Sequence, residues 1–491
     1  MTSVTNREAA IDLDRLDLRS FAGRPVAVLG FARSGVALTR FLVDRGARVT
    51  VYDARSADQL AEPIAALAGR RPRLLLGPEV EPATALERQA LICTSPSVSS
   101  RYPTTEPRLR AALAEVEAAG QVPVVSEVDL FLRLCPAATI GVTGTKGKTT
   151  TSSLTAAVLA AGASPVILGG NLGIPLVERL PDIGSGHRVV LELSELQLPT
   201  LSRGTDIAVY THVTSDHLDR HGSLEAYRAV KRRLAELLPP GGALVRNDDD
   251  PVVSTYTAPA GTSLIRYRQA PPAADSVGVA DDWIVAGGEL VPTGHDGRIV
   301  PLAEIPLPGR HSVSNVLAAT AVGLLHGVAP AAIAEAVRSF PGVEHRLERV
   351  AEVAGVSYIN DSQGTQPDAV IAAVRSFERP LVLIAGGRSK GVPVASLAAA
   401  VAERVTAAVL IGETAAELEA AFRQAGLARV EHAGSMDQAV ELATAIAREQ
   451  APATVLLSPA AASFDMFRDY EARGAAFKSA VAALTAEEAD R

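Results

Sequence analysis

The chain has 491 residues, of which 47% are hydrophobic and 21% charged, so it can form about three globular domains and is too apolar for wholesale disorder. Its net charge is −8, whereas a protein that coats nucleic acid needs a surplus of basic residues. We therefore expect a folded protein without a nucleic-acid partner.

The two cysteines are too few for a disulfide framework or a cysteine-rich zinc site. The N-terminal segment is polar and has no apolar core typical of a signal peptide. The sequence contains no run of about 18 uncharged apolar residues, so we expect no transmembrane helix. These features predict a cytoplasmic protein that does not insert into membranes.

Short runs rich in β-branched residues alternate with alanine-rich segments of helical spacing, which is typical of α/β domains with mainly parallel sheets. The predicted strands are 26–30, 48–52, 90–94, 138–143, 188–193, 206–211, 381–385, 407–411 and 454–458. The predicted helices are 150–161, 224–237, 313–325, 395–404 and 414–425. Segment 255–305 alternates around Trp283–Val285 and Leu290–Pro292, and is predicted to form a small β insertion or subdomain.

Proline residues mark two predicted domain boundaries. Pro136 precedes the strand at 138–143, and Pro341 follows the helix that closes the central region. The predicted domains are 1–136, 137–341 and 342–491.

A glycine-rich turn, Gly30-Phe-Ala-Arg-Ser-Gly35, follows the first predicted strand, and Asp53 comes after the second. The arrangement is similar to a dinucleotide-binding fingerprint, but Ala32 stands where the middle glycine belongs. Taken alone, this weak pattern leaves an NAD-binding protein open.

The strongest motif is Gly141-Val-Thr-Gly-Thr-Lys-Gly-Lys-Thr-Thr150, between the strand at 138–143 and the helix at 150–161. Backbone N–H groups of such a turn, at a helix N-terminus, cradle phosphates. Lys148 would face the β- and γ-phosphates, and the Thr149 hydroxyl would face Mg²⁺. Val142 replaces the first glycine of the usual spacing, so we expect a variant P-loop. A P-loop module that binds ATP without catalysis is an alternative.

Three further residues carry chemistry at predicted element ends or on helices. Glu192 ends the strand at 188–193, where a carboxylate can reach a metal held by the P-loop. His217 lies in an Asp-His-Leu-Asp sequence after the next strand, a weak metal-ligand signal. Lys231 lies on the predicted helix 224–237, where the helical pattern alone favours a solvated surface residue.

The order of these motifs resembles the Mur ligases, ATP-dependent amide-forming enzymes of peptidoglycan precursor synthesis. The resemblance extends from about residue 20 to residue 480 and rests on GTKGKTT, GGNLGIP, ELSELQL, THVTSDHLDRHGSLEAYRAVKRR, PGRHSVSNVLAA, HRLE, NDSQGT and LLSPAAASFDMFRDYEARG. It implies a Rossmann-like N-terminal domain that binds a UDP-sugar, a central P-loop ATPase domain with a parallel sheet, and a C-terminal α/β domain that binds an amino acid. The last motif points to the branch that adds glutamate to UDP-N-acetylmuramoyl-L-alanine. The resemblance also implies that the chain acts as a monomer.

The resemblance also implies roles for individual residues. Two Mg²⁺ ions would be held by Thr149, Glu192, His217 and Lys231, with Lys231 carbamylated by CO₂, and Asn171 would polarise the acyl group or the phosphate. The residues expected around ATP are Gly144, Thr145, Lys146, Gly147, Lys148, Thr149, Thr150, Asn315, Arg346 and Asp361. The residues expected around the sugar nucleotide and glutamate are Ser34, Asp53, Arg55, Ser95, Thr365, Lys390, Ser463 and Tyr470.

The expected amino-acid pocket departs from the usual family pattern. A lysine that faces the incoming glutamate is Gln363 here, and the usual late phenylalanine is Tyr470. Gln366 and Glu195 are further departures. Because a lost cation changes how a dicarboxylate is held, the sequence favours L-glutamate as the added isomer, with D-glutamate as the alternative. A ligase of the folylpolyglutamate type is disfavoured, because that branch begins with the ATP domain.

Overall fold

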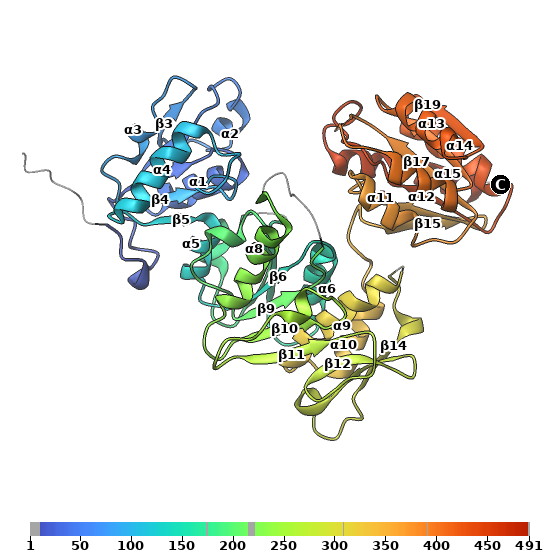
Figure 1. The fold of residues 1–491 in the computed structure, drawn as a ribbon, viewed down its shortest axis with the longest axis horizontal. Coiled ribbons are helices and arrows are strands. Elements are labelled where there is room, and N and C mark those ends of the chain that lie inside the picture. Colours follow the sequence, from blue (N-terminus) through green and yellow to red (C-terminus); the bar gives the residue numbers. More distant parts are fainter. Residues whose placement is uncertain (1–9, 173–174, 215–220, 308, 390, 490–491) are drawn as a thin grey trace, which may run out of the picture. The chain divides into compact units, whose positions relative to one another are not determined.

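The structure is a computed structural model that describes residues 10–172, 175–214, 221–307, 309–389 and 391–489 (Figure 1). It contains three sheets with helices packed on them, which confirms the predicted α/β class. Residue contacts divide the chain into two compact units, Met1–Glu304 with Val313–Arg338, and Ile305–Ser312 with Ser339–Arg491. The first unit contains two of the sheets, so the division into three domains stays a prediction.

The first sheet is parallel, with the strand order β3-β2-β1-β4-β5. Its strands are β1 (Pro25–Leu29), β2 (Arg48–Asp53), β3 (Arg73–Leu76), β4 (Leu91–Thr94) and β5 (Val124–Ser126). Its helices are α1 (Arg33–Asp44), α2 (Ala61–Ala65), α3 (Ala83–Leu86), α4 (Pro107–Ala119) and α5 (Glu127–Leu134). Side chains of α1 and α5 pack on one face of the sheet, and those of α3 and α4 on the other.

The second sheet has the order β14-β13-β12-β11-β10-β9-β6-β8-β7, parallel from β7 to β12 and antiparallel beyond. Its strands are β6 (Ala138–Thr143), β7 (Val166–Gly170), β8 (Arg188–Glu192), β9 (Ile207–Tyr210), β10 (Ala243–Asn247), β11 (Ser263–Tyr267), β12 (Ser276–Ala280), β13 (Trp283–Ala286) and β14 (Arg298–Pro301). Its helices are α6 (Lys148–Ala160), α8 (Leu224–Glu236), α9 (Arg310–Leu325) and α10 (Pro330–Arg338).

Segment 255–305 differs in part from the prediction. Its strands continue the second sheet from β10 to β14 and do not form a separate subdomain. The expected strand at Leu290–Pro292 is wrong: a 3-10 helix, Gly288–Leu290, occupies its start, and β14 follows later in the chain. Alternate side chains are buried at this sheet edge, so the alternation of apolar residues indicated β structure. The alternation did not show how these strands pair with their neighbours.

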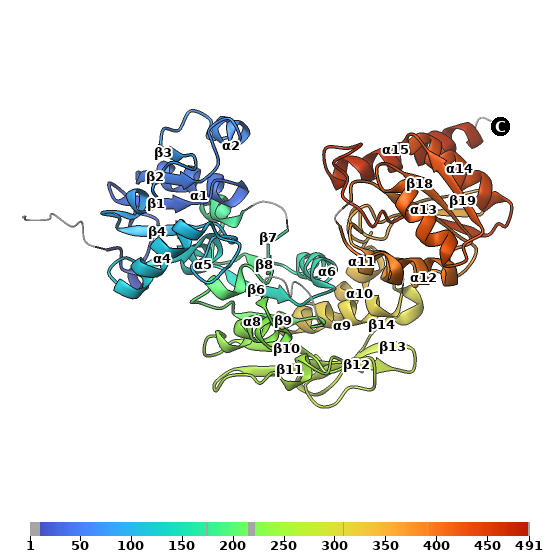
Figure 2. The ribbon, with the colours of Figure 1, turned by 45° about the horizontal axis from the view of Figure 1, so that its top comes forward.

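The third sheet lies in the second unit and has the order β15-β16-β20-β17-β18-β19, with only β15 antiparallel to its neighbour. Its strands are β15 (Glu348–Val353), β16 (Val356–Asn360), β17 (Leu381–Gly386), β18 (Ala407–Ile411), β19 (Arg429–Ala433) and β20 (Ala453–Leu457). Its helices are α11 (Pro367–Val374), α12 (Ala395–Arg404), α13 (Ala415–Gln424), α14 (Met436–Arg448) and α15 (Tyr470–Ala489), distributed over both faces (Figure 2).

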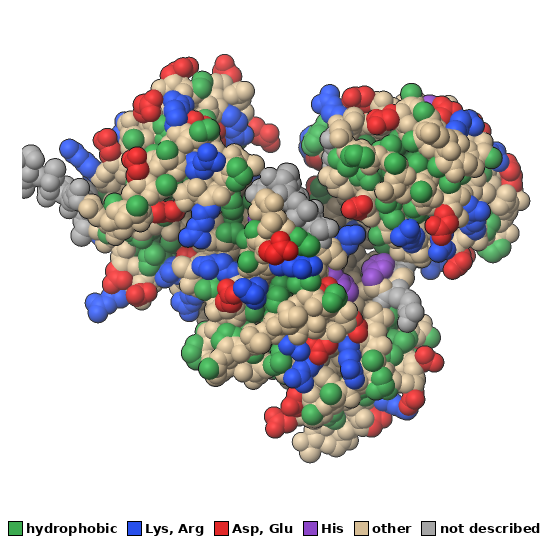
Figure 3. Space-filling view, in the orientation of Figure 1, with side chains coloured by type: hydrophobic (Ala, Val, Ile, Leu, Met, Phe, Trp, Pro, Cys, Tyr) green, Lys and Arg blue, Asp and Glu red, His purple; other side chains and the backbone are tan. Residues whose placement is uncertain are grey.

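Other features of the chain bear on the site only indirectly. Among the described residues, the helices are too short or too polar to cross a membrane. On the face shown in Figure 3, acidic and basic side chains are interspersed over both units. Cys93 is buried in β4, which raises the pKa of its thiol, and Cys135 is half-buried; neither forms a disulfide.

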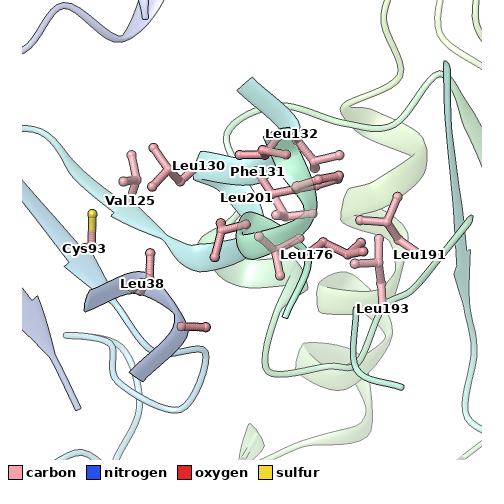
Figure 4. Packing of buried hydrophobic residues seen from close by; sticks show 14 of the residues in the cluster. Leu38, Cys93, Val125, Leu130, Phe131, Leu132, Leu176, Leu191, Leu193 and Leu201 are labelled. Carbon is pink, nitrogen blue, oxygen red and sulfur yellow. The ribbon is translucent and has the colours of Figure 1, made fainter. Parts of the chain in front are cut away.

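One hydrophobic cluster runs through both sheets of the first unit (Figure 4). Phe131 and its neighbours on α5 lie among side chains of the second sheet and of the 3-10 helix η2 (Leu176–Asp182). Glu127, the first residue of α5, is buried in this contact, and the Val177 N–H donates to its Oε1 over 3.4 Å. Burial raises the pKa of Glu127 to about 7.

Glu127→Gln should change the pH dependence of stability. Since burial raises the folded-state pKa, the contribution of Glu127 is complete below pH 4.5 and is lost as the pH rises through about 7. The glutamine side chain cannot ionise, so the variant should be about 2–3 kcal/mol more stable than the natural protein at pH 8 and nearly equal to it at pH 4.5. Urea unfolding at both pH values measures this, with the exposed Glu115→Gln as control. Equal differences at both pH values would contradict a buried, proton-binding Glu127.

Candidate active site

The glycine-rich turn at 144–147 joins β6 to α6, as the P-loop motif predicts. Helix α6 begins at Lys148, two residues earlier than expected, and Gly147 precedes it with a φ of 86°. No side-chain hydrogen bond from the described residues caps this end, and the N-terminus of a helix favours an anion. The turn therefore has the backbone geometry of a phosphate cradle.

Two glycines allow neighbouring side chains to approach this turn closely. A Cβ at Gly144 would lie 2.0 Å from Thr211 Oγ1, and one at Gly147 would lie 2.8 Å from Asn315 Oδ1. Thr211 Oγ1 donates to the Lys146 carbonyl over 2.6 Å, and Asn315 Oδ1 accepts from Thr151 Oγ1 over 3.1 Å. Asn315 thus lies beside the turn.

Thr145 connects the turn to two other segments. Its N–H donates to the His212 carbonyl over 2.5 Å, and its Oγ1 accepts from the Thr214 N–H over 3.0 Å. Its hydroxyl also forms a 2.8 Å hydrogen bond with the Tyr227 hydroxyl on α8. These contacts fix the turn against the segment that leads to His217, a predicted ligand that lies outside the described residues.

Two lysines meet at the Gly144 carbonyl. Lys148 Nζ donates to the carbonyls of Gly144 and Thr145 over 3.0 Å each, and Lys231 Nζ donates to the Gly144 carbonyl over 3.0 Å. Lys231 is fully buried, so the surface position that the helical pattern favoured is wrong. Its Nζ also lies 5.5 Å from the centre of the Tyr227 ring. The site therefore places two lysine amines beside the N-terminus of α6, an arrangement that suits a polyphosphate.

Glu192 lies at the end of β8, next to Val142 of β6. Asn171 holds it twice: its N–H donates to the Glu192 carbonyl over 2.8 Å, and its Nδ2 donates to Glu192 Oε1 over 2.7 Å. Glu192 Oε2 is buried and has no hydrogen-bond partner among the described residues. A carboxylate oxygen left over at the end of β8, a strand that contacts α6, fits the oxygen ligands that Mg²⁺ prefers.

The glycine-rich turn of the first sheet is organised around Asp53. Its carboxylate accepts from the Phe31 N–H over 2.7 Å and pairs with Arg55 over 2.7 Å. Burial raises its pKa, but hydrogen bonds from Arg55 and Phe31 bring it below the ordinary value. Ser95 Oγ donates to the Gly30 carbonyl over 2.8 Å, so this hydroxyl supports the turn.

A cavity of about 310 Å³ opens beside this turn. Gly30 and Asp53 line it, whereas Ser34, Arg55 and Ser95 do not. Sequence reasoning assigned no site role to other lining residues such as Tyr52, Thr105 and Glu106. The Glu106-Pro107 pair, where Glu106 caps α4, was the available signal, because a cap before proline marks a helix start at the sheet edge.

In the second unit, Asp361 and Arg346 come together near the end of β16. Asp361 Oδ2 accepts from Ser458 Oγ over 2.6 Å, and burial raises the pKa of Asp361 to about 6 although the Arg346 charge lowers it. A Cβ at Gly364 would lie 2.4 Å from Asp361 Oδ2, so this loop needs glycine for close packing. Gln363 Oε1 lies 3.5 Å from Arg346 Nη1, which makes it an acceptor for that guanidinium.

Three residues expected around glutamate are described in this unit. Thr365 donates its N–H to the Gln363 carbonyl over 2.8 Å, and Ser463 is buried. Tyr470 begins α15, and its ring meets His345 edge-on. Lys390 lies outside the described residues. The sequence analysis missed Arg473, which is 1% exposed and donates to both Oγ and the carbonyl of Ser362.

Gly144→Ala should weaken nucleotide binding without unfolding the protein. The new methyl group would clash with Thr211 Oγ1 and displace the turn, so affinity for a non-hydrolysable ATP analogue with Mg²⁺ should fall at least tenfold, about 1.4 kcal/mol. Calorimetric titration measures the affinity. Gly186→Ala is the matched control, since nothing lies within 4 Å of its Cβ. Unchanged affinity in Gly144→Ala would contradict the phosphate cradle.

Comparisons with known proteins agree on one family. The family model for the Mur ligase middle domain matches residues 142–323, and that for the Mur ligase glutamate ligase domain matches residues 345–461. A UDP-N-acetylmuramoylalanine–D-glutamate ligase of Symbiobacterium thermophilum is 41% identical over 468 residues, covering 94% of this chain and 98% of the relative. One from Roseiflexus is 39% identical and covers 94% and 99%.

Solved structures agree with this chain in fold. The UDP-N-acetylmuramate-alanine ligase of Thermotoga maritima has a TM-score of 0.56 at 16% identity, covering 94% of this chain and all of that one. A pseudomurein peptide ligase type C from Methanothermus fervidus has a TM-score of 0.53 at 17% identity, with the same coverage. At such identities the likeness concerns the fold alone.

Proposed function

The chain belongs to the Mur ligase family, and from that premise we propose that it is an ATP-dependent ligase that joins UDP-N-acetylmuramoyl-L-alanine to D-glutamate in peptidoglycan precursor synthesis. The observation that carries the proposal is 41% identity across nearly the full length of a relative named for this reaction. The phosphate cradle at 144–147 and the leftover oxygen of Glu192 support it independently.

The isomer of glutamate is where the proposal departs from the sequence analysis. Gln363, Gln366, Tyr470 and Glu195 favoured L-glutamate there, whereas the relatives at 37–41% identity are named for D-glutamate. We adopt D-glutamate because those relatives match almost the whole chain, including the amino-acid-binding region.

The proposed reaction has two steps. A carboxylate oxygen of UDP-N-acetylmuramoyl-L-alanine attacks the γ-phosphorus of ATP, and the bond to the β-phosphate oxygen breaks, which gives an acyl phosphate and ADP. The glutamate amine then attacks the acyl carbon, loses a proton, and phosphate departs. Activation is needed because a free carboxylate is a poor electrophile. Bound Mg²⁺ would neutralise charge on the transferring phosphoryl group.

Residues of the first unit take the following proposed roles. N–H groups from Lys146 to Thr150 would hold the phosphates, and Lys148 would turn from its loop carbonyls to the β- and γ-phosphates. Thr149 and Glu192 would hold Mg²⁺, with His217 and a carbamylated Lys231. Asn171 keeps Glu192 in place and faces the acyl phosphate. Asn315 would bind adenine.

The remaining roles divide between sugar nucleotide and glutamate. Ser34, Asp53, Arg55 and Ser95 support the sugar-nucleotide loop in a domain of residues 1–136, ahead of the ATP domain at 137–341. In the domain at 342–491, Arg346 would face the γ-phosphate and Asp361 the ribose. Glutamate would be held by Thr365, Lys390, Ser463 and Tyr470.

The function is tested by ADP release with UDP-N-acetylmuramoyl-L-alanine and each glutamate enantiomer. We expect turnover with both substrates present, and at least a tenfold larger kcat/KM for D-glutamate, about 1.4 kcal/mol in transition-state binding. Lys148→Ala should abolish release while the protein stays folded. Release with neither enantiomer would overturn the proposed reaction, and a preference for L-glutamate would overturn the isomer alone.

Lys231→Ala tests the proposed carbamate. In that modification the neutral amine bonds to the carbon of CO₂ and loses a proton, which turns a cation into an anion that can bind Mg²⁺. The variant should lose at least 100-fold in kcat, and short-chain carboxylates such as acetate should restore part of it. Arg232→Ala, on the exposed side of α8, is the control. Full activity of the unrescued Lys231→Ala would show that the lysine only supports the loop.

A further inference from the structure

Three polar contacts join the helices of the first sheet to the segment that follows β7. Arg33 Nη2 donates to the Asn171 carbonyl over 3.4 Å, and Arg40 Nε lies 3.0 Å from Glu178 Oε1. The third is the Val177 N–H on the buried Glu127 carboxylate. They lie along one seam between α1, α5 and η2, yet only Arg33 touches a residue bound to Glu192.

Arg33 lies between two sites that the proposed reaction must bring together. It is the first residue of α1, directly after Gly30-Phe-Ala in the turn expected to bind the sugar nucleotide. At its other end the guanidinium meets Asn171, which binds Glu192 through both its backbone N–H and its side chain. Two hydrogen bonds therefore separate Arg33 from Glu192 Oε1.

Close packing of the backbone around Asn171 makes its contacts with Glu192 stiff. Gly170 has a φ of 92°, and a Cβ there would lie 2.5 Å from the Glu192 carbonyl, so β7 and β8 approach closely just before Asn171. A displacement of the Asn171 carbonyl must then move its amide and the carboxylate that it holds. Glu192 Oε2, the oxygen without a described partner, would move with them.

Arg33 and Arg40, both on α1, differ in their partners. Within the described ranges Arg33 forms no ion pair, and its charge acts on Glu127 by lowering that carboxyl's pKa against the effect of burial. Arg40, by contrast, is committed to Glu178. Both arginines face the segment after β7, but Arg33 donates to a backbone carbonyl, whereas Arg40 pairs with a carboxylate.

We infer that Arg33 is a positioning residue that fixes the Asn171–Glu192 pair relative to the sugar-nucleotide turn. The substrate carboxylate and the residues around the transferred phosphoryl group then keep a constant arrangement. The inference rests on the proposed function. It assigns Arg33 no contact with reacting atoms; it acts through Asn171.

Arg33→Gln tests the inference against the matched Arg40→Gln. Second-sphere support of a metal ligand is typically worth 10–100-fold in activity or metal affinity. Because Arg33 acts one contact further out, through Asn171, Arg33→Gln should lower kcat by the smaller of these factors, about tenfold, with KM for glutamate within about twofold of the natural protein. Arg40→Gln should keep kcat within about twofold. Arg33→Lys, which retains the charge and a donor, should recover part of the loss.

A second measurement does not depend on turnover. Mn²⁺, which accepts the same oxygen ligands as Mg²⁺, is titrated by its electron paramagnetic resonance signal in the presence of ADP. Arg33→Gln should weaken Mn²⁺ binding several-fold, whereas Arg40→Gln should not, and both variants should share one urea midpoint. This readout remains interpretable even if the natural protein releases no ADP with either glutamate. A failure of the proposed reaction can therefore be distinguished from a failure of the inference about Arg33.

Two results would overturn the inference. One is equal behaviour of Arg33→Gln and Arg40→Gln in both kcat and Mn²⁺ affinity. The other is a loss of activity in Arg33→Gln that follows a lowered urea midpoint, because Arg33 would then only stabilise the seam.

Discussion

The close approach of the turn at 144–147 to the residues after β9 is the constraint on which the candidate site depends. Thr211 and Asn315 reach the turn only because Gly144 and Gly147 have no side chains. That approach orients the N–H groups of α6, brings Thr145 onto Tyr227, and places the Gly144 carbonyl where Lys231 can donate to it. The phosphate cradle is thus built by tertiary contacts across β9 and α8, beyond the motif itself.

Local sequence patterns predicted about half of the parallel strands and five of the described helices, because buried parallel strands are continuous apolar runs. They failed where burial depends on a distant partner. Lys231 has the spacing of an exposed helical residue, yet it is fully buried because the Gly144 carbonyl, 87 positions away, accepts from it. The edge strand β14 was missed because it has only four residues, too few for a clear alternating pattern.

The candidate site shows the same division. The P-loop, Glu192 and Asp53 carry local signals, at strand ends and in glycine-rich turns. Arg473 and Gln363 carry none, since an isolated arginine or glutamine is usually a surface group. Gln363 gains a role only through the fold, which sets its side-chain carbonyl beside Arg346. In the sequence, Arg473 was noted only within a motif and Gln363 only as a departure from one, and the contacts of both come from the fold.

The two lysines on the Gly144 carbonyl bear on the energetics of nucleotide capture. Lys148 already has two carbonyl acceptors before any phosphate arrives, so binding exchanges one set of acceptors for another. The net gain is then the difference between charged and neutral hydrogen bonds, well below the full strength of either. Side-chain rearrangements take picoseconds to nanoseconds, so this exchange lowers the affinity for nucleotide without slowing its association.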